Sequence, residues 1–168
     1  NTIGGPGNGN VITANNNDEI ELRNSVANQI DSNRIGTNSA GTTIIASNGV
    51  GIVLDDSDVN LVLRNTIAGN SGGGIDVVTA AVRNTIYANH IYNNTGLGID
   101  LGNNGVTPND PGDSDTGDNQ LQNYPILTIA TESRVKGMLD TLPGDIDLHF
   151  YVNDTCDASG YGEGESYV

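Results

Sequence analysis

A six-residue unit, Asn-x-Ile-x-x-Asn, recurs along the first hundred residues and limits the folds that are open to this chain. The unit begins at Asn10, Asn28, Asn65 and Asn84, and a degenerate copy fills Thr43 to Asn48. Successive starts lie about 15 to 22 residues apart. Self-similarity at a period near 20 residues is typical of a solenoid in which each repeat is one coil.

The apolar residues indicate which solenoid this is. They come as short aliphatic pairs two positions apart, such as Ile52 with Leu54, Ile75 with Val77, and Ile99 with Leu101. This alternation favours strands with one face inward, and Asn and Gly end each strand after a few residues. Leucine-rich repeats need Leu at fixed inward positions, which is not the pattern here. The sequence predicts an all-β, right-handed parallel β-helix with two or three strands per coil and five coils spanning roughly 25 Å.

The repeated asparagines have a structural interpretation. We expect Asn15, Asn33, Asn48, Asn70 and Asn89 to occupy equivalent turns and to stack into one ladder. Each side-chain amide would bond the coils above and below, while its own backbone takes the left-handed geometry of the turn. Sugar binding by this ladder is the alternative.

Charge and composition exclude several classes of function. The net charge is −15, and the six basic residues are too scattered to form a phosphate-binding stripe, so nucleic acid is not an expected partner. The acidity suits solubility and divalent cations. No apolar run approaches the ~18 residues of a membrane span. The lone Cys156 says nothing about redox compartment, and would be a free thiol or pair beyond residue 168.

An acidic loop follows the last repeat. Calcium binds six to eight oxygen ligands on flexible loops, and alternating aspartates with a turn-forming glycine are typical of such sites. The loop lacks the final Glu of an EF-hand. We therefore predict a structural Ca²⁺ site, with a solvated loop of Asx turns as the alternative. The expected ligands are Asn109, Asp110, Asp113, Asp115 and Asp118.

Beyond the loop the pattern changes to antiparallel β-structure. Residues 145–152 alternate as a half-buried strand, Leu142 to Asp145 supply a turn, and residues 134–139 are the expected partner strand. This hairpin caps the β-helix or begins a β-sandwich. The predicted organisation is a β-helix over 1–104, an acidic junction over 105–125, and an antiparallel segment over 126–168.

These segments together resemble a known protein family. The Asn-x-Ile rungs, residues 96–102, the acidic stretch 106–126, and residues 147–156 with 160–164 are similar to right-handed parallel β-helix repeat surface proteins. These belong to the pectate-lyase-like superfamily and are of the type associated with CSLREA-containing secreted chains. The resemblance implies a fragment of an extracellular or cell-surface protein that includes the start of a C-terminal β-sandwich. It supplies no catalytic residues.

Three functions follow from these patterns. The first is a non-catalytic structural or adhesion module whose open coil ends allow self-assembly. The second is a polysaccharide lyase or glycoside hydrolase. The third is carbohydrate binding, for which Tyr87, Tyr92 and Tyr124 are the exposed aromatic candidates. Expected partners are therefore a second copy or a cell-surface polysaccharide. Two sequons, at Asn93 and Asn153, are possible glycan acceptors.

No catalytic set stands out from the sequence. A lyase needs a basic residue as proton acceptor, but Arg23, Arg64 and Arg83 recur before repeat asparagines, as a structural position does. Lys136 is the remaining candidate base. For a hydrolase, the carboxylates to consider are Asp55, Asp56 and Asp58, expected in a solvated turn, with Asp76 and Asp100, expected to point outward from their strands.

Overall fold

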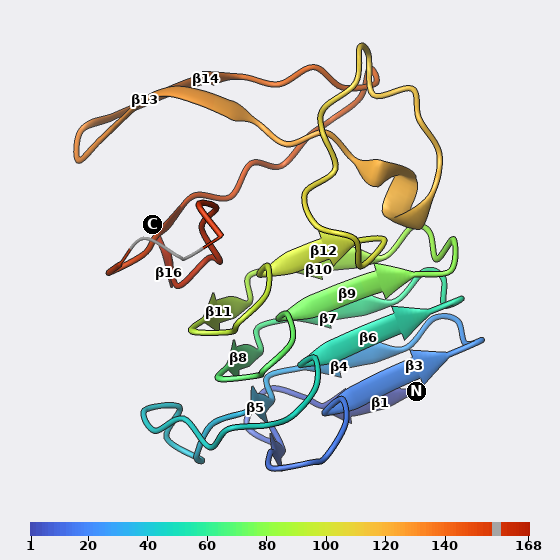
Figure 1. Cartoon of the computed structure of the whole chain (residues 1–168), viewed down its shortest axis with the longest axis vertical. Coiled ribbons are helices and arrows are strands. Elements are labelled where there is room, and N and C mark those ends of the chain that lie inside the picture. The colour runs from blue at the N-terminus through green and yellow to red at the C-terminus, as the bar shows by residue number, and fades with distance from the viewer. Residues whose placement is uncertain (156–158) are drawn as a thin grey trace.

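The computed structural model describes residues 1–155 and 159–168, and most of its strands build a parallel β-helix (Figure 1). Cys156 lies outside the described residues. The β-helix has four coils instead of the predicted five, and each coil gives one strand to each of three parallel sheets. Sheet 1 contains β1 (Thr2–Gly4), β4 (Gln29–Asp31), β7 (Leu61–Leu63) and β10 (Thr85–Tyr87). Sheet 2 contains β2 (Val11–Ile12), β5 (Arg34–Ile35), β8 (Thr66–Ala68) and β11 (His90–Tyr92). Sheet 3 contains β3 (Ile20–Arg23), β6 (Ile52–Asp55), β9 (Ile75–Val78) and β12 (Ile99–Leu101).

The core is a thin column of aliphatic side chains. In-register pairing places Ile30 beside Val62, and Ile35 beside Ile67, so each inward position repeats from coil to coil. The central members are fully buried, and burying one such side chain is worth about 1.5–3 kcal/mol. The predicted alternation in sheet 3 is confirmed in the two central coils, whereas Ile99 of the last coil, expected to face inward, is 43% exposed. The inward residues of sheet 3 in the two central coils are Ile52, Leu54, Ile75 and Val77.

Asparagine ladders run along the corners between the sheets. At the corner before sheet 1, Asn28 bonds Asn60 and Asn60 bonds Asn84, each through a backbone N–H and a side-chain Nδ2 that donate to the next Oδ1 at 2.9–3.1 Å. The second ladder, before sheet 2, has the same bonds through Asn10, Asn33, Asn65 and Asn89. A third and shorter ladder joins Asn70 to Asn94.

The single ladder predicted from the sequence is therefore wrong in its membership. Asn33 and Asn89 share the second ladder, Asn70 belongs to the third, and Asn48 instead donates its N–H to the carbonyl of Asn15 at 3.3 Å. The Asn-x-Ile-x-x-Asn unit spans one strand between two corners and occurs up to twice in a coil. Equivalent asparagines thus lie 23, 24 or 32 residues apart, as in the second ladder through Asn10, Asn33, Asn65 and Asn89.

The left-handed backbone also lies one residue earlier than predicted. The residue before every ladder asparagine except Asn10 has positive φ, including Ser32 (59°), Val59 (57°) and Arg64 (55°). This conformation is unfavourable for a β-branched residue such as Val59 and persists only where neighbouring contacts enforce it. The two ladder bonds made by the next residue, Asn60, supply that constraint.

Two groups from beyond the β-helix end the first and third ladders. Asn119 accepts the N–H of Asn84 at 2.8 Å and returns its own Nδ2 to the carbonyl of Asn84 at 2.9 Å. It lies in η1 (Asp118–Leu121), the one helical element in residues 1–155 and 159–168. The Glu163 carboxylate accepts the N–H and Nδ2 of Asn94 at 2.9–3.3 Å. The final coil is thus capped by two later segments.

The chain after β12 contains two short antiparallel ribbons. β13 (Ile126–Thr131) pairs with β14 (Arg134–Met138), and β15 (Tyr151–Val152) pairs with β16 (Ser166–Tyr167). The predicted pairing of residues 134–139 with 145–152 is wrong, because β13 takes the first segment and only the end of the second is a strand. Figure 1 shows the β13–β14 ribbon extending away from the coils.

Candidate functional site

The acidic junction brings three of the five predicted ligands together. Oxygen atoms of the Asp110, Asp113 and Asp115 carboxylates all lie within 4.8 Å of one another. The three residues are partly buried, and their carboxylates lie close enough together to contact one cation.

Neighbouring segments hold this cluster in place. Asp113 accepts the N–H of Asn123 and the hydroxyl of Thr141, both at 2.8 Å. Asp110 accepts the N–H and hydroxyl of Ser114, the latter at 2.7 Å, while its own N–H donates to Asn123 Oδ1 at 3.0 Å. Asn123 is 3% exposed, so the loop is fixed from beneath by a buried amide.

The other two predicted ligands are not members of this group of three carboxylates. The Asn109 side chain pairs with the backbone of Tyr124, which it bonds at 2.8 Å as donor and 3.0 Å as acceptor. Asp118 begins η1, and its Oδ1 is buried without a hydrogen bond from the described residues. Asn109 therefore serves the loop backbone, and Asp118 is an orphan acceptor at the edge of the same junction.

Asp115 is the least satisfied member of the cluster. Its Oδ1 is buried and receives no hydrogen bond from the part of the chain that is described. Burial first, and then the charges of Asp110 and Asp113, raise the pKa of the Asp115 carboxyl above its usual value. A bound cation would remove both penalties.

A second group of carboxylates lies on the outer face of sheet 3. Asp76 of β9 and Asp100 of β12 are register partners on adjacent coils, and they point outward as predicted. They are nevertheless buried, at 3% and 8% exposure. Asp100 accepts the backbone N–H groups of Asn104 (3.4 Å) and Gly105 (3.0 Å), whereas Asp76 accepts no hydrogen bond from any described residue. Burial, followed by the charges of Asp100 and Asp18, raises the pKa of Asp76 to about 6.

The arginines of the β-helix that were weighed as catalytic bases pair with carboxylates. Arg64 donates a hydrogen bond from Nε to the fully buried Asp31 at 3.0 Å. Burial by itself would raise the pKa of Asp31, but the hydrogen bonds from Arg64, Ser32 and Gln29 outweigh it and lower that pKa. Arg23 contacts Glu21 and Asp55, and Arg83 lies 4.0 Å from Asp58. Each of these guanidinium groups thus pairs with a carboxylate of the β-helix itself.

The aromatic candidates for a sugar platform are also engaged by the protein. Tyr92 donates its hydroxyl to the carbonyl of Gly41 at 2.9 Å, and Tyr87 meets His149 edge-on with ring centroids 4.5 Å apart. Tyr124 meets Tyr161 edge-on at 6.5 Å.

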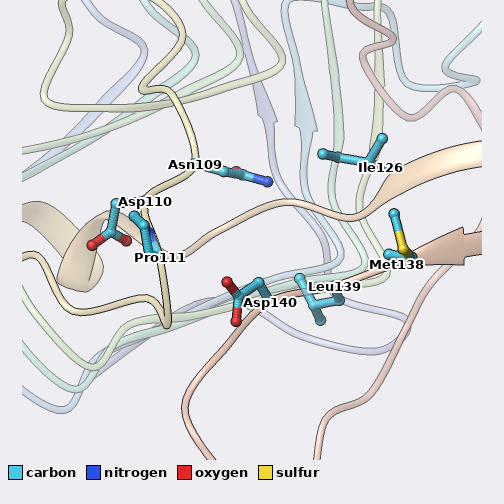
Figure 2. A pocket seen from close by; sticks show the side chains of 7 residues that line it. All are labelled: Asn109, Asp110, Pro111, Ile126, Met138, Leu139 and Asp140. Carbon is cyan, nitrogen blue, oxygen red and sulfur yellow. The ribbon is translucent and has the colours of Figure 1, made fainter.

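A pocket of about 640 Å³ opens between the junction and the base of the β13–β14 ribbon (Figure 2). Its apolar lining includes Ile126 and Met138, which face each other across the ribbon. Asp140 is the carboxylate among the lining residues nearest the ribbon in Figure 2, and one of its oxygens accepts the N–H of Gly112 at 3.0 Å.

Sequence reasoning missed two residues that matter here, and it missed the burial of a third. Asn119 and Glu163 end the ladders from positions 35 and 69 residues beyond their partners, and neither carries the repeat motif. The carboxylate of Asp76 packs against the glycine turn that leads into its own strand, since a Cβ at Gly73 would lie 3.1 Å from that carboxylate. The run Gly72-Gly73-Gly74 was the available local signal.

Comparison with known proteins agrees with this architecture. The family model described as "Right handed beta helix region" matches residues 5–114, which is more than half of the chain. The match covers all twelve strands of the coils except β1. Neither the search of curated proteins nor the search of solved structures returned a match. The described residues contain no helix with the length and hydrophobicity of a membrane span. The chain belongs to the right-handed β-helix family.

Proposed function

We propose that this chain is a non-catalytic structural or adhesion module of an extracellular or cell-surface protein. The observation that carries the proposal is the use of the repeated polar groups. The asparagines of three ladders bond one another, and Arg23, Arg64 and Arg83 bond carboxylates of the same β-helix. A rigid rod needs such contacts between coils, whereas a catalytic site needs polar groups that are free to meet a substrate. The net charge of −15 is in keeping with an exposed, soluble surface.

The finer resemblance, to CSLREA-associated surface proteins with a sandwich after the β-helix, is part of this proposal. The junction and the ribbons after β12 support it, since they continue the chain as antiparallel structure.

The competing function is an enzyme that acts on acidic polysaccharides. We expect no turnover of pectin, pectate or alginate at millimolar calcium, monitored by the ultraviolet absorbance of unsaturated products and by reducing-end release. Product that increases with protein concentration and is lost in Arg64→Ala or Asp76→Asn would overturn the structural assignment.

We further propose that calcium binds the acidic junction and fixes it to the β-helix. The close carboxylates of Asp110, Asp113 and Asp115, with the orphan oxygens of Asp115 and Asp118, support this site. Thr141 and Asn123 connect the cluster to the β13–β14 ribbon, and η1 connects it to the first ladder. The cation would therefore be structural.

Calcium removal should lower the stability of the chain. At calcium a hundredfold above the dissociation constant, binding to the folded state is worth about 2.7 kcal/mol. We expect thermal melts in EDTA to shift down by roughly 5–10 °C. Asp115→Asn should abolish this difference, because it removes a ligand charge without breaking a hydrogen bond that the structure shows. Asp145→Asn, at an exposed site outside the cluster, is the matched control. Identical melts with and without EDTA, together with no calcium uptake in calorimetry, would refute the site.

A further inference from the structure

The β13–β14 ribbon exposes more apolar surface than a stable isolated hairpin would. All of its residues except Ile129 are exposed, including Ile126 (51%), Leu127 (50%) and Met138 (69%). Among the described residues, its strands hydrogen-bond as strands only to each other. A two-stranded ribbon is marginal in water, and an open strand edge is a template for another strand.

The two free edges of the ribbon differ. β13 carries a register shift between Leu127 and Ile129, and such an irregularity disrupts pairing along a strand edge. β14 is regular, so its free edge is the one suited to a partner. Alternation places Arg134, Lys136 and Met138 on one face of β14.

We propose that β14 pairs antiparallel with β14 of a second copy, around a two-fold axis at Gly137. Two β13–β14 ribbons would then form one four-stranded sheet. In this register Arg134 lies opposite Asp140 of the other copy, and Lys136 lies opposite Met138 of the other copy. Because the axis is two-fold, each of these contacts occurs twice.

Charge complementarity identifies the second copy as the partner. Neither Arg134 nor Lys136 has a carboxylate within 4.0 Å among the residues that the structure describes, although the chain is strongly acidic. Basic residues on an edge strand prevent indiscriminate pairing, and they accept a partner that offers acidic groups in register. This chain offers one such group in register, because Asp140 follows β14 by two residues and lines the pocket at the base of the ribbon.

The pocket at the base of the ribbon gives the incoming arginine a place to bind. Its 640 Å³ volume, the stems of Ile126, Met138 and Leu139, and the carboxylate of Asp140 suit an aliphatic side chain with a cationic end (Figure 2). Gly137 at the axis has no side chain to obstruct the two backbones.

Sedimentation velocity on the 168-residue chain tests the association. We expect a concentration-dependent monomer–dimer equilibrium, weakened at least roughly tenfold by Arg134→Glu because an attractive pair becomes repulsive. Arg83→Glu changes the net charge equally on the β-helix and should leave the equilibrium unchanged. An equimolar mixture of Arg134→Glu and Asp140→Arg should restore dimers, because both contacts are again attractive.

Disulfide trapping tests the register. Residues opposed in an antiparallel pair have Cα atoms about 4.5–5.5 Å apart, within reach of a disulfide. In a Cys156→Ser background, Lys136→Cys mixed with Met138→Cys should cross-link on mild oxidation, and either variant alone should not. A chain that stays monomeric at millimolar concentration would overturn the proposal, as would trapping of either variant with itself. Dimers that persist in Arg134→Glu would also overturn it.

Discussion

Asn65→Ala is expected to unfold a large part of the β-helix. The Asn65 side chain is fully buried and takes part in four hydrogen bonds, two donated by Asn33, one donated to Asn89 and one donated to the carbonyl of Ile30, all at 2.9–3.0 Å. Truncation leaves the Asn33 donors and the carbonyl of Ile30 without their hydrogen-bond partner, and each buried group left unpaired costs about 1–3 kcal/mol. We expect a loss of about 4 kcal/mol, measured by urea unfolding.

A matched substitution separates the ladder from asparagine content. Asn16 is exposed and no hydrogen bond of its side chain is present in the described structure, so Asn16→Ala should change stability by less than about 0.5 kcal/mol. If Asn65→Ala were as mild as Asn16→Ala, the ladders would not hold the coils together.

Asp76→Asn should stabilise the chain at neutral pH and not in acid. The folded-state pKa of Asp76, about 6, lies above the ordinary value of 3.8. The folded protein therefore holds this proton more tightly than the unfolded chain, and stability is lost as pH rises from about 4 through 6. The shift corresponds to about 3 kcal/mol, which we reduce to roughly 2 kcal/mol for solvent screening.

The measurement is the difference in unfolding free energy between the variant and the parent chain at two pH values. We expect a gain of roughly 2 kcal/mol at pH 7.5 that falls to a few tenths at pH 4. The added amide also has a neighbouring acceptor in the Asp100 carboxylate. Asp145→Asn, which removes an exposed charge, is the control. A pH-independent gain would show that titration of Asp76 is not the cause.

The fold could be predicted because its signals are local and repeated. Ile and Asn recur at fixed spacing. Only a parallel stack of coils buries the Ile side chains and also lets the Asn side chains hydrogen-bond one another. The ladder membership could not be predicted, because the same six-residue unit joins the first ladder to the second at one place and the second ladder to the third at another. The 32-residue separation of Asn33 from Asn65, against 24 from Asn65 to Asn89, hides which copies are equivalent.

The sites divide in the same way. Spacing along one loop was enough to group Asp110, Asp113 and Asp115. Spacing did not indicate that the Asn109 side chain bonds the backbone of Tyr124, or that Asp76 packs against the turn at Gly73. The β13–β14 pairing had one signal, a two-residue connection at Glu132 and Ser133, but it lacks the Asn or Gly that usually identifies such a turn.

The unequal coil lengths have a practical consequence. Between the first and second ladders the spacing is five residues in three coils, as in Asn28 to Asn33, and the extra length of the second coil lies largely in residues 36–51 between β5 and β6. The equivalent connection between β8 and β9 occupies only residues 69–74. This corner can therefore accept grafted peptides or tags while the stacking of neighbouring coils is preserved. A sequence pattern for further coils should keep the five-residue spacing between the first two ladders fixed. It should allow the connection between sheets 2 and 3 to vary in length.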